Sequence, residues 1–204
     1  AGVTSGHLVD ISGKALTLRG GYTDTNWTTA YPITQPTTLD GVNAGRVIRT
    51  NRALMVENLS ILNGLSSASP GGGIWNSSSS AGVTIYTSTL RNNNGGFASS
   101  GWGGGVAANG PVTIAYSTFA YNLAGVSGGG AVYAGRATLI NSTFYSNTAA
   151  GDGGALFVNS TASILNSTLS HNQADPGVGT GGGLWVSGTI YLTNTLIANN
   201  GPND

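Results

Sequence analysis

Residues 144–156 have the sequence FYSNTAAGDGGAL and contain the two short patterns that decide the fold. In the first, an apolar residue is followed three positions later by Asn, here Phe144 and Asn147. In the second, two glycines precede a small and an apolar residue, here Gly153 to Leu156. The first pattern recurs at Leu90/Asn93, Phe119/Asn122, Phe144/Asn147, Leu169/Asn172 and Ile197/Asn200. The second recurs at Gly71–Ile74, Gly103–Val106, Gly129–Val132, Gly153–Leu156 and Gly181–Leu184.

The two patterns alternate and keep their phase along the chain. From Ile74 onward the Gly-Gly pattern returns after 32, 26, 24 and 28 residues, and each copy is followed by an Asn pattern. A constant phase with variable spacing is typical of stacked structural units whose insertions lie on the outside.

Within each unit the apolar residues alternate with period two, which predicts strands. These apolar pairs are Leu54/Val56, Val83/Ile85, Val112/Ile114, Ala137/Leu139, Ala162/Ile164 and Ile190/Leu192. One unit cannot bury its own apolar face, whereas parallel stacking at about 4.8 Å per turn builds one continuous core. The sequence therefore predicts an all-β fold, a parallel β-helix.

The predicted organisation is one β-solenoid domain over residues 1–204 with about seven rungs. Residues 1–64 form irregular N-terminal rungs with a loop at 24–36, and residues 65–204 hold the five repeats. The corners between strands are predicted to carry a structural ladder, because Asn tolerates the left-handed conformation and bonds to an identical residue above it. Its members are Asn58, Asn141, Asn166, Asn194, Asn93, Asn122, Asn147, Asn172 and Asn200.

Composition excludes several function classes. Only 7% of the 204 residues are charged, and seven basic residues balance seven acidic ones. The basic stripe that nucleic acid requires is therefore missing. The chain has no Cys, and no apolar run reaches the roughly 18 residues of a membrane span. In-register stacking explains the low charge, because equal charges would lie above one another and repel.

The Gly-Gly-Ala-apolar and Phe-x-x-Asn patterns resemble the repeats of the polymorphic outer membrane proteins. Residues 16–64, with Leu18 to Tyr22 and Thr37 to Gly41, are similar to the start of bacterial secreted β-helix repeat proteins. The resemblance implies a right-handed parallel β-helix and a bacterial extracellular or cell-surface location. These motifs are architectural and imply no activity. Within residues 1–204 we expect no β-barrel or other obvious anchor of those families.

The titratable residues favour no catalytic site and no cofactor. Some right-handed β-helix proteins cleave acidic polysaccharides, which needs clustered carboxylates. Asp152 and Asp175 lie in corresponding loops and are weak candidates for a cation site, but turn roles beside Gly and Pro are favoured. Arg46, Arg49 and Arg52 form a basic cluster near Glu57. For these arginines a solvated surface is favoured over an anion site.

Two minor features are also expected to be structural. His171 has no second ligand in register, so a structural role is favoured over a catalytic one. Six Asn-x-Ser/Thr sequons start at Asn26, Asn58, Asn76, Asn141, Asn159 and Asn166. Because Asn58, Asn141 and Asn166 are expected to point inward, glycan acceptors are expected only at Asn26, Asn76 and Asn159.

Two outward columns are candidates for an interaction surface. Residues next to the inward apolar column form the first: Trp75, Ala107, Tyr133, Phe157 and Trp185. The second contains Tyr86, Ala115, Ile140, Leu165 and Thr193. Aromatic columns can stack on surface glycans or on another copy of the protein, and contiguous apolar patches tend to mark interaction sites. Alternatively, Phe97 and Trp102 from the 94–102 insertion cover the first column.

The preferred hypothesis is a non-catalytic extracellular β-solenoid, either a self-associating fibre or sheath subunit or an adhesin segment. The sequence stops at Gly201–Asp204, just after the last Asn corner, so either it was trimmed there or the open end meets another subunit head to tail. The alternative is a polysaccharide-binding or polysaccharide-cleaving protein that uses the aromatic column. A third, weaker hypothesis is ice binding. Only one outward Thr column supports it, at Thr89, Thr118, Thr143 and Thr168.

Overall fold

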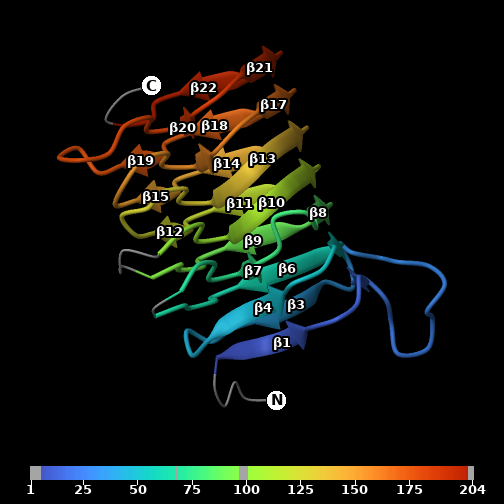
Figure 1. Ribbon diagram of the computed structural model, residues 1–204. Helices are drawn as coiled ribbons and strands as arrows, with labels where there is room; N and C mark the ends of the chain where they lie inside the picture. Colours follow the sequence, from blue (N-terminus) through green and yellow to red (C-terminus); the bar gives the residue numbers. More distant parts are fainter. Residues whose placement is uncertain (1–5, 68, 97–100, 202–204) are drawn as a thin grey trace.

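The computed structural model describes residues 6–67, 69–96 and 101–201. Within these residues, every regular secondary-structure element is a β-strand. Their neighbours in the sheets run parallel. The strands stack turn upon turn along one axis, with β1 at one end and β21 and β22 at the other (Figure 1). The predicted parallel β-solenoid is therefore confirmed.

Each turn has three main sides, and three of the turns add a strand on a short fourth side. The first side stacks β1 (His7–Ile11), β4 (Arg46–Thr50), β7 (Ile74–Asn76), β10 (Val106–Ala115), β13 (Val132–Ile140), β16 (Leu156–Val158) and β20 (Leu184–Val186). The second stacks β2 (Leu16–Arg19), β5 (Leu54–Glu57), β8 (Val83–Tyr86), the C-terminal halves of β10 and β13, β17 (Ala162–Leu165) and β21 (Ile190–Thr193). The third stacks β3 (Thr37–Asp40), β6 (Leu59–Leu62), β9 (Thr89–Arg91), β11 (Thr118–Ala120), β14 (Thr143–Tyr145), β18 (Thr168–Ser170) and β22 (Leu196–Ala198). The fourth contains β12 (Leu123–Ala124), β15 (Thr148–Ala149) and β19 (Gln173–Ala174).

The solenoid has about five complete turns, slightly fewer than the seven or so rungs that the sequence predicts. The difference lies in the two outermost turns, β1–β3 and β20–β22. In the described part of the chain, each of these has a neighbouring turn on one side only. Residues 20–36 also interrupt the first turn as a long loop between β2 and β3, which projects from the stack (Figure 1).

The core consists of apolar columns that run from turn to turn. The predicted inward column is in register, with Ile74, Val106, Val132, Leu156 and Leu184 as successive partners. On the third side, Phe119 and Phe144 stack with ring centroids 4.9 Å apart, and both are fully buried. Each fully buried side chain of this size stabilises the fold by about 1.5–3 kcal/mol.

The two glycines of each Gly-Gly pattern have different structural roles. The first glycine of each pair has a positive φ, between 53° and 73° at Gly71, Gly103, Gly129, Gly153 and Gly181. The second packs against the backbone of the next turn: a Cβ on Gly154 would overlap the carbonyl oxygen of Gly182 and lie 2.5 Å from backbone atoms of Gln173. The turns therefore approach more closely here than any other side chain allows.

A buried asparagine ladder holds one corner of every repeat. Asn147 donates from Nδ2 to Asn172 Oδ1 at 2.9 Å and to the Phe119 carbonyl at 3.0 Å. Its own Oδ1 accepts from Nδ2 and the backbone N–H of Asn122. The ladder residues Asn93, Asn122, Asn147, Asn172 and Asn200 are all buried. Stacking therefore satisfies both ends of each amide inside the core.

The other predicted corner residues lie on the outside. Asn58, Asn141, Asn166 and Asn194 have left-handed φ values of 46–56°, as their residue type favours. The side chains of Asn141, Asn166 and Asn194 are exposed and that of Asn58 is half-buried. The expectation that Asn58, Asn141 and Asn166 point inward is therefore wrong, because the inward place at this corner is taken by the next residue. Ser88, Ser117, Ser142 and Ser167 are buried there, and hydroxyls accept from the backbone N–H of the preceding turn.

Candidate functional site

The first outward column lies on the first side of the solenoid, where the sequence predicts it. Strand register aligns Trp75 with Ala107, Ala107 with Tyr133, then Phe157 and Trp185. The four aromatic side chains are half-buried, whereas Ala107 is fully buried. Ala107 lies between Trp75 and Tyr133, whose larger side chains flank it in register.

Four aromatic rings in this region form a continuous stack. Trp102 stacks on Tyr133 with centroids 4.6 Å apart, Tyr133 on Phe157 at 5.2 Å, and Phe157 on Trp185 at 4.1 Å. The interplanar angles are 12–25°, so the ring faces between Trp102 and Trp185 are covered by one another. Trp102 comes from the insertion that the sequence predicts as a cover, and Phe97 lies outside the described residues.

The stack is expected to stabilise the fold through Phe157. Phe157→Ala removes two ring pairs and part of an apolar surface, and we expect it to lower the free energy of unfolding by about 2–4 kcal/mol. Trp75→Ala is the matched control, since no ring pair includes Trp75 among the described residues, and about 1–2 kcal/mol is expected there. Urea unfolding of both variants measures the difference. Equal losses would show that the ring pairs add nothing.

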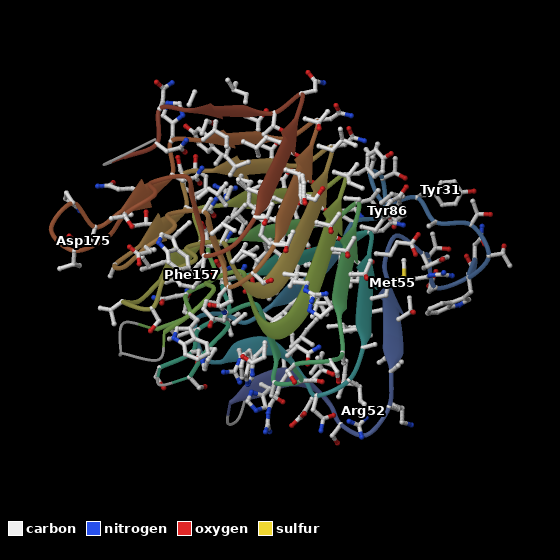
Figure 2. The ribbon with its side chains drawn as sticks, turned by 45° about the horizontal axis from the view of Figure 1, so that its top comes forward. Tyr31, Arg52, Met55, Tyr86, Phe157 and Asp175 are labelled. Atoms are coloured by element: carbon white, nitrogen blue, oxygen red, sulfur yellow. The ribbon has the colours of Figure 1, made fainter. Side chains whose placement is uncertain are left out.

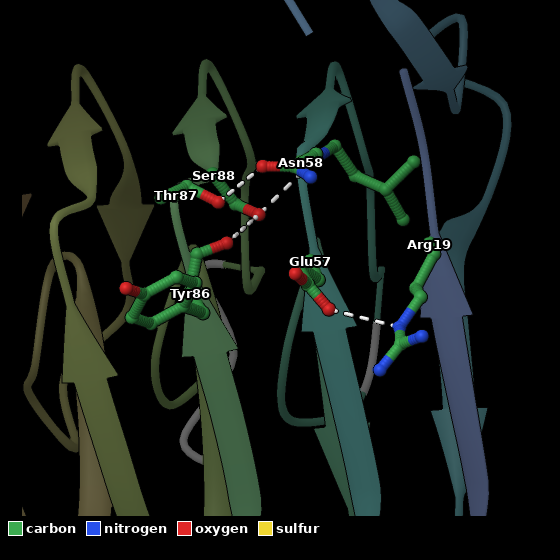
Figure 3. Close-up of polar contacts among 7 residues, drawn as sticks. Arg19, Glu57, Asn58, Tyr86, Thr87 and Ser88 are labelled. Carbon is green, nitrogen blue, oxygen red and sulfur yellow. Dashed lines mark hydrogen bonds and ion pairs between the residues drawn. The ribbon is translucent and has the colours of Figure 1, made fainter. Parts of the chain in front are cut away.

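The second outward column lies on the second side, and an ion pair lies in register at one end of it. Tyr86 is 37% exposed and Leu165 36%, and Ile140 is half-buried between them in register. At one end of this column Arg19 Nε lies 2.9 Å from a Glu57 carboxylate oxygen (Figure 3). Tyr86 also packs edge to face with Tyr116, with centroids 5.3 Å apart.

The carboxylates are engaged in separate structural contacts. Asp152 accepts from the backbone N–H and hydroxyl of Thr180, at 2.7 and 2.8 Å. Asp175 accepts from the Gly177 N–H at 2.7 Å and shapes its own turn, on a loop at the edge of the molecule (Figure 2). Asp10 lies 3.5 Å from Arg49. In the described residues no three potential ligands gather at one point, so the structure does not bring Asp152 and Asp175 into a metal cluster.

Arg46 does not belong to a solvated basic cluster. Its side chain is 4% exposed, and its Nε and Nη2 donate to the carbonyls of Gly71 and Pro70, each at 2.7 Å. Its Nη2 also donates to Ser66 and Ser69, and its Nη1 lies 3.4 Å from His7 Nδ1. Burial lowers the pKa of Arg46 to about 10, with a further contribution from Arg49.

The arginine expectations are thus corrected. Arg49 and Arg52 are exposed as expected. Glu57, however, pairs with Arg19 rather than with this cluster. Burial and the charge of Arg46 also lower the pKa of His7. The sequence contains no signal for Arg46 because, apart from Gly71, its acceptors lie outside the repeated patterns, at Ser66, Ser69 and Pro70.

His171 and the sequons show where side chains reach solvent. His171 is exposed at a corner with φ 57° and lies beside Tyr145. Asn76 is fully buried, which contradicts the expectation that it can accept a glycan. Asn159 is exposed and donates to the Tyr133 hydroxyl at 2.7 Å, and Asn26 is half-buried.

The outward threonine column is in register along the third side. Thr89, Thr118 and Thr143 are successive partners, followed by Thr168. A second hydroxyl column, which the sequence interpretation missed, runs along the second side at Thr84, Thr113, Thr138 and Ser163. In the sequence, each member of this column is the residue between the two members of an apolar pair.

Comparisons with known proteins add no information about the site, which is therefore described from its geometry. No family model, curated protein or solved structure matches the chain. Within the described residues, no helix has the length and apolarity to cross a membrane.

Proposed function

We propose that this protein is a non-catalytic structural β-solenoid of the bacterial cell surface that associates with itself end to end. Its surface is built from columns that extend along the stack, and such columns can continue from one molecule into the next. Five carboxylates support a structural rather than a catalytic use, because each holds an ion pair, a turn or a neighbouring loop. The resemblance to surface-protein repeats supports the location.

The observation that carries the proposal is that both ends of the described solenoid present the same core columns. Register connects Leu16 through Leu54 and Val83 to Ile190, and Leu18 through Val56 and Ile85 to Leu192. In the middle of the stack these side chains are buried, whereas Leu16 is 38% exposed, Ile190 39% and Leu192 49%.

Apposing the two ends would bury these side chains and extend each column with the same parallel pairing. Leu18 of one copy would lie against Leu192 of the next. The unpaired N–H and C=O groups of an edge strand would gain partners as well. Because the two contacting surfaces differ, the contact is heterologous and generates filaments.

Sedimentation velocity over a concentration series, with electron microscopy, tests the proposal. We expect the wild-type chain to form linear oligomers as concentration rises. Leu192→Lys places a charge in an inward column at the end and should abolish them. Tyr191→Lys changes the neighbouring outward residue of the same strand and should preserve them. A wild-type chain that stays monomeric at its solubility limit would refute self-association.

A further inference from the structure

A hollow of about 390 Å³ lies between the 20–36 loop and the corner that joins the second and third sides. This volume falls in the range of about 300–1,000 Å³ that is usual for small-molecule sites. Its lining includes Ile33 from the loop, Ser60, Thr89 and Thr118 from β6, β9 and β11, and Thr87 and Tyr116 from the corner. We propose that this hollow binds a neutral carbohydrate.

Free hydroxyl groups form the floor of the hollow. Ser60, Thr89 and Thr118 are in-register partners on β6, β9 and β11, so their side chains repeat at the strand spacing. Among the described residues, no hydrogen-bond partner is found for these three side chains. They differ in this from Thr37, whose hydroxyl accepts from the Gly21 N–H, and from Thr87, whose hydroxyl donates to Asn58 (Figure 3).

Apolar and aromatic groups form the walls. Tyr116 is 52% exposed, and its edge-to-face contact with Tyr86 fixes the ring position. Ile33, on the 20–36 loop, is 93% exposed and adds an apolar side chain to the lining. Tyr31, on the same loop, lies on the same side of the molecule as Tyr86 in Figure 2. A sugar ring offers an apolar C–H face and a rim of hydroxyls, and therefore matches an aromatic wall beside a hydroxyl floor.

The charge of the hollow selects a neutral ligand. None of its lining residues is charged. The charged residues nearest to it in sequence, Arg19 and Glu57, neutralise each other, because Arg19 Nε lies 2.9 Å from a Glu57 carboxylate oxygen. An acidic saccharide would require an unpaired cation, since burial of an unpaired charge is unfavourable.

Tyr116 itself occupies a position that favours another residue type. It has φ 52° in a corner column where four of the six residues are Asn, and Thr87 in the same column has φ 45°. A left-handed backbone is rare for bulky and β-branched residues, and in this chain Val42 and Tyr121 also adopt it outside the hollow. Tyr116 and Thr87 both line the hollow.

The test is a glycan microarray of neutral and acidic oligosaccharides, with thermal unfolding of the same proteins. We expect the wild-type chain to bind neutral glycans and Tyr116→Asn to weaken binding at least tenfold, while its midpoint temperature stays equal or rises. Tyr121→Asn is the matched control. Tyr121 also has a left-handed φ, is 48% exposed and packs edge to face with a tyrosine, but lies outside the hollow.

The control variant should keep wild-type binding. The proposal is overturned if the wild-type chain binds no neutral glycan, if it binds acidic glycans alone, or if Tyr116→Asn binds as well as Tyr121→Asn. Because the hollow is far along the chain from β20–β22, Leu192→Lys should bind glycans normally. Failure of carbohydrate binding and failure of self-association are therefore separable.

Discussion

Replacing Gly154 by alanine is expected to lower the free energy of unfolding by about 3–5 kcal/mol, or to prevent folding. The added Cβ would overlap the Gly182 carbonyl oxygen and lie 2.5 Å from the backbone N and C of Gln173. These atoms belong to the backbone of the stack, so they cannot move aside as the end of a flexible side chain can. Chemical denaturation followed by circular dichroism measures the loss.

Gly183→Ala is the matched control. It lies in the third position of a Gly-Gly pattern, and the equivalent residues of two other repeats are Ala131 and Ala155, both fully buried. We expect a change below about 1 kcal/mol there. A Gly154→Ala protein as stable as Gly183→Ala would contradict the close approach of neighbouring turns.

Asn147→Ala is expected to cost about 3–5 kcal/mol. The change removes four hydrogen bonds: two donated by Nδ2 of Asn147, and two that its Oδ1 accepts from Asn122. Their partners remain buried, so the Asn122 amide groups and the Phe119 carbonyl lose these contacts away from water. Urea unfolding gives the change in free energy.

The control for this prediction is Asn141→Gly, a corner asparagine on the outside. Its φ of 48° is open to glycine, and its side chain is exposed. We expect a loss below about 1 kcal/mol. If both variants lose the same free energy, the buried ladder does not contribute more than an exposed corner residue.

The fold could be predicted because one repeat fixes the position of all the others. Period-two alternation places Ile85 and Ile114 inward, and the constant phase of the Asn pattern aligns Asn147 with Asn172. Both follow from short-range pattern and in-register stacking. Whether a corner asparagine points inward or outward cannot be predicted from this pattern. A left-handed φ suits Asn equally well whether its side chain is buried or exposed.

Features that depend on irregular segments could not be predicted. Burial of Arg46 requires acceptors such as Ser66 and the Pro70 carbonyl, which lie outside the repeated patterns. The sequence names Trp102 as a candidate cover of the first outward column, but it does not identify Tyr133 as the ring on which Trp102 stacks. The hollow at Tyr116 combines the 20–36 loop with strands from four successive turns, so no single stretch of sequence contains it.

Engineered cross-linking tests end-to-end association most directly, because the chain contains no cysteine of its own. Leu18→Cys combined with Leu192→Cys places one thiol at each end of the same core column. In-register contact between copies would bring their Cα atoms to the spacing of neighbouring strands, about 4.8 Å, which suits a disulfide. Leu39→Cys with Leu192→Cys is the control, since these residues lie in different columns.

On mild oxidation at high concentration, the account predicts a ladder of covalent multimers for the Leu18/Leu192 pair, seen on a non-reducing gel. The Leu39/Leu192 pair should give few of them. Absence of multimers from the Leu18/Leu192 pair, or equal multimers from both pairs, would contradict end-to-end stacking of the solenoid.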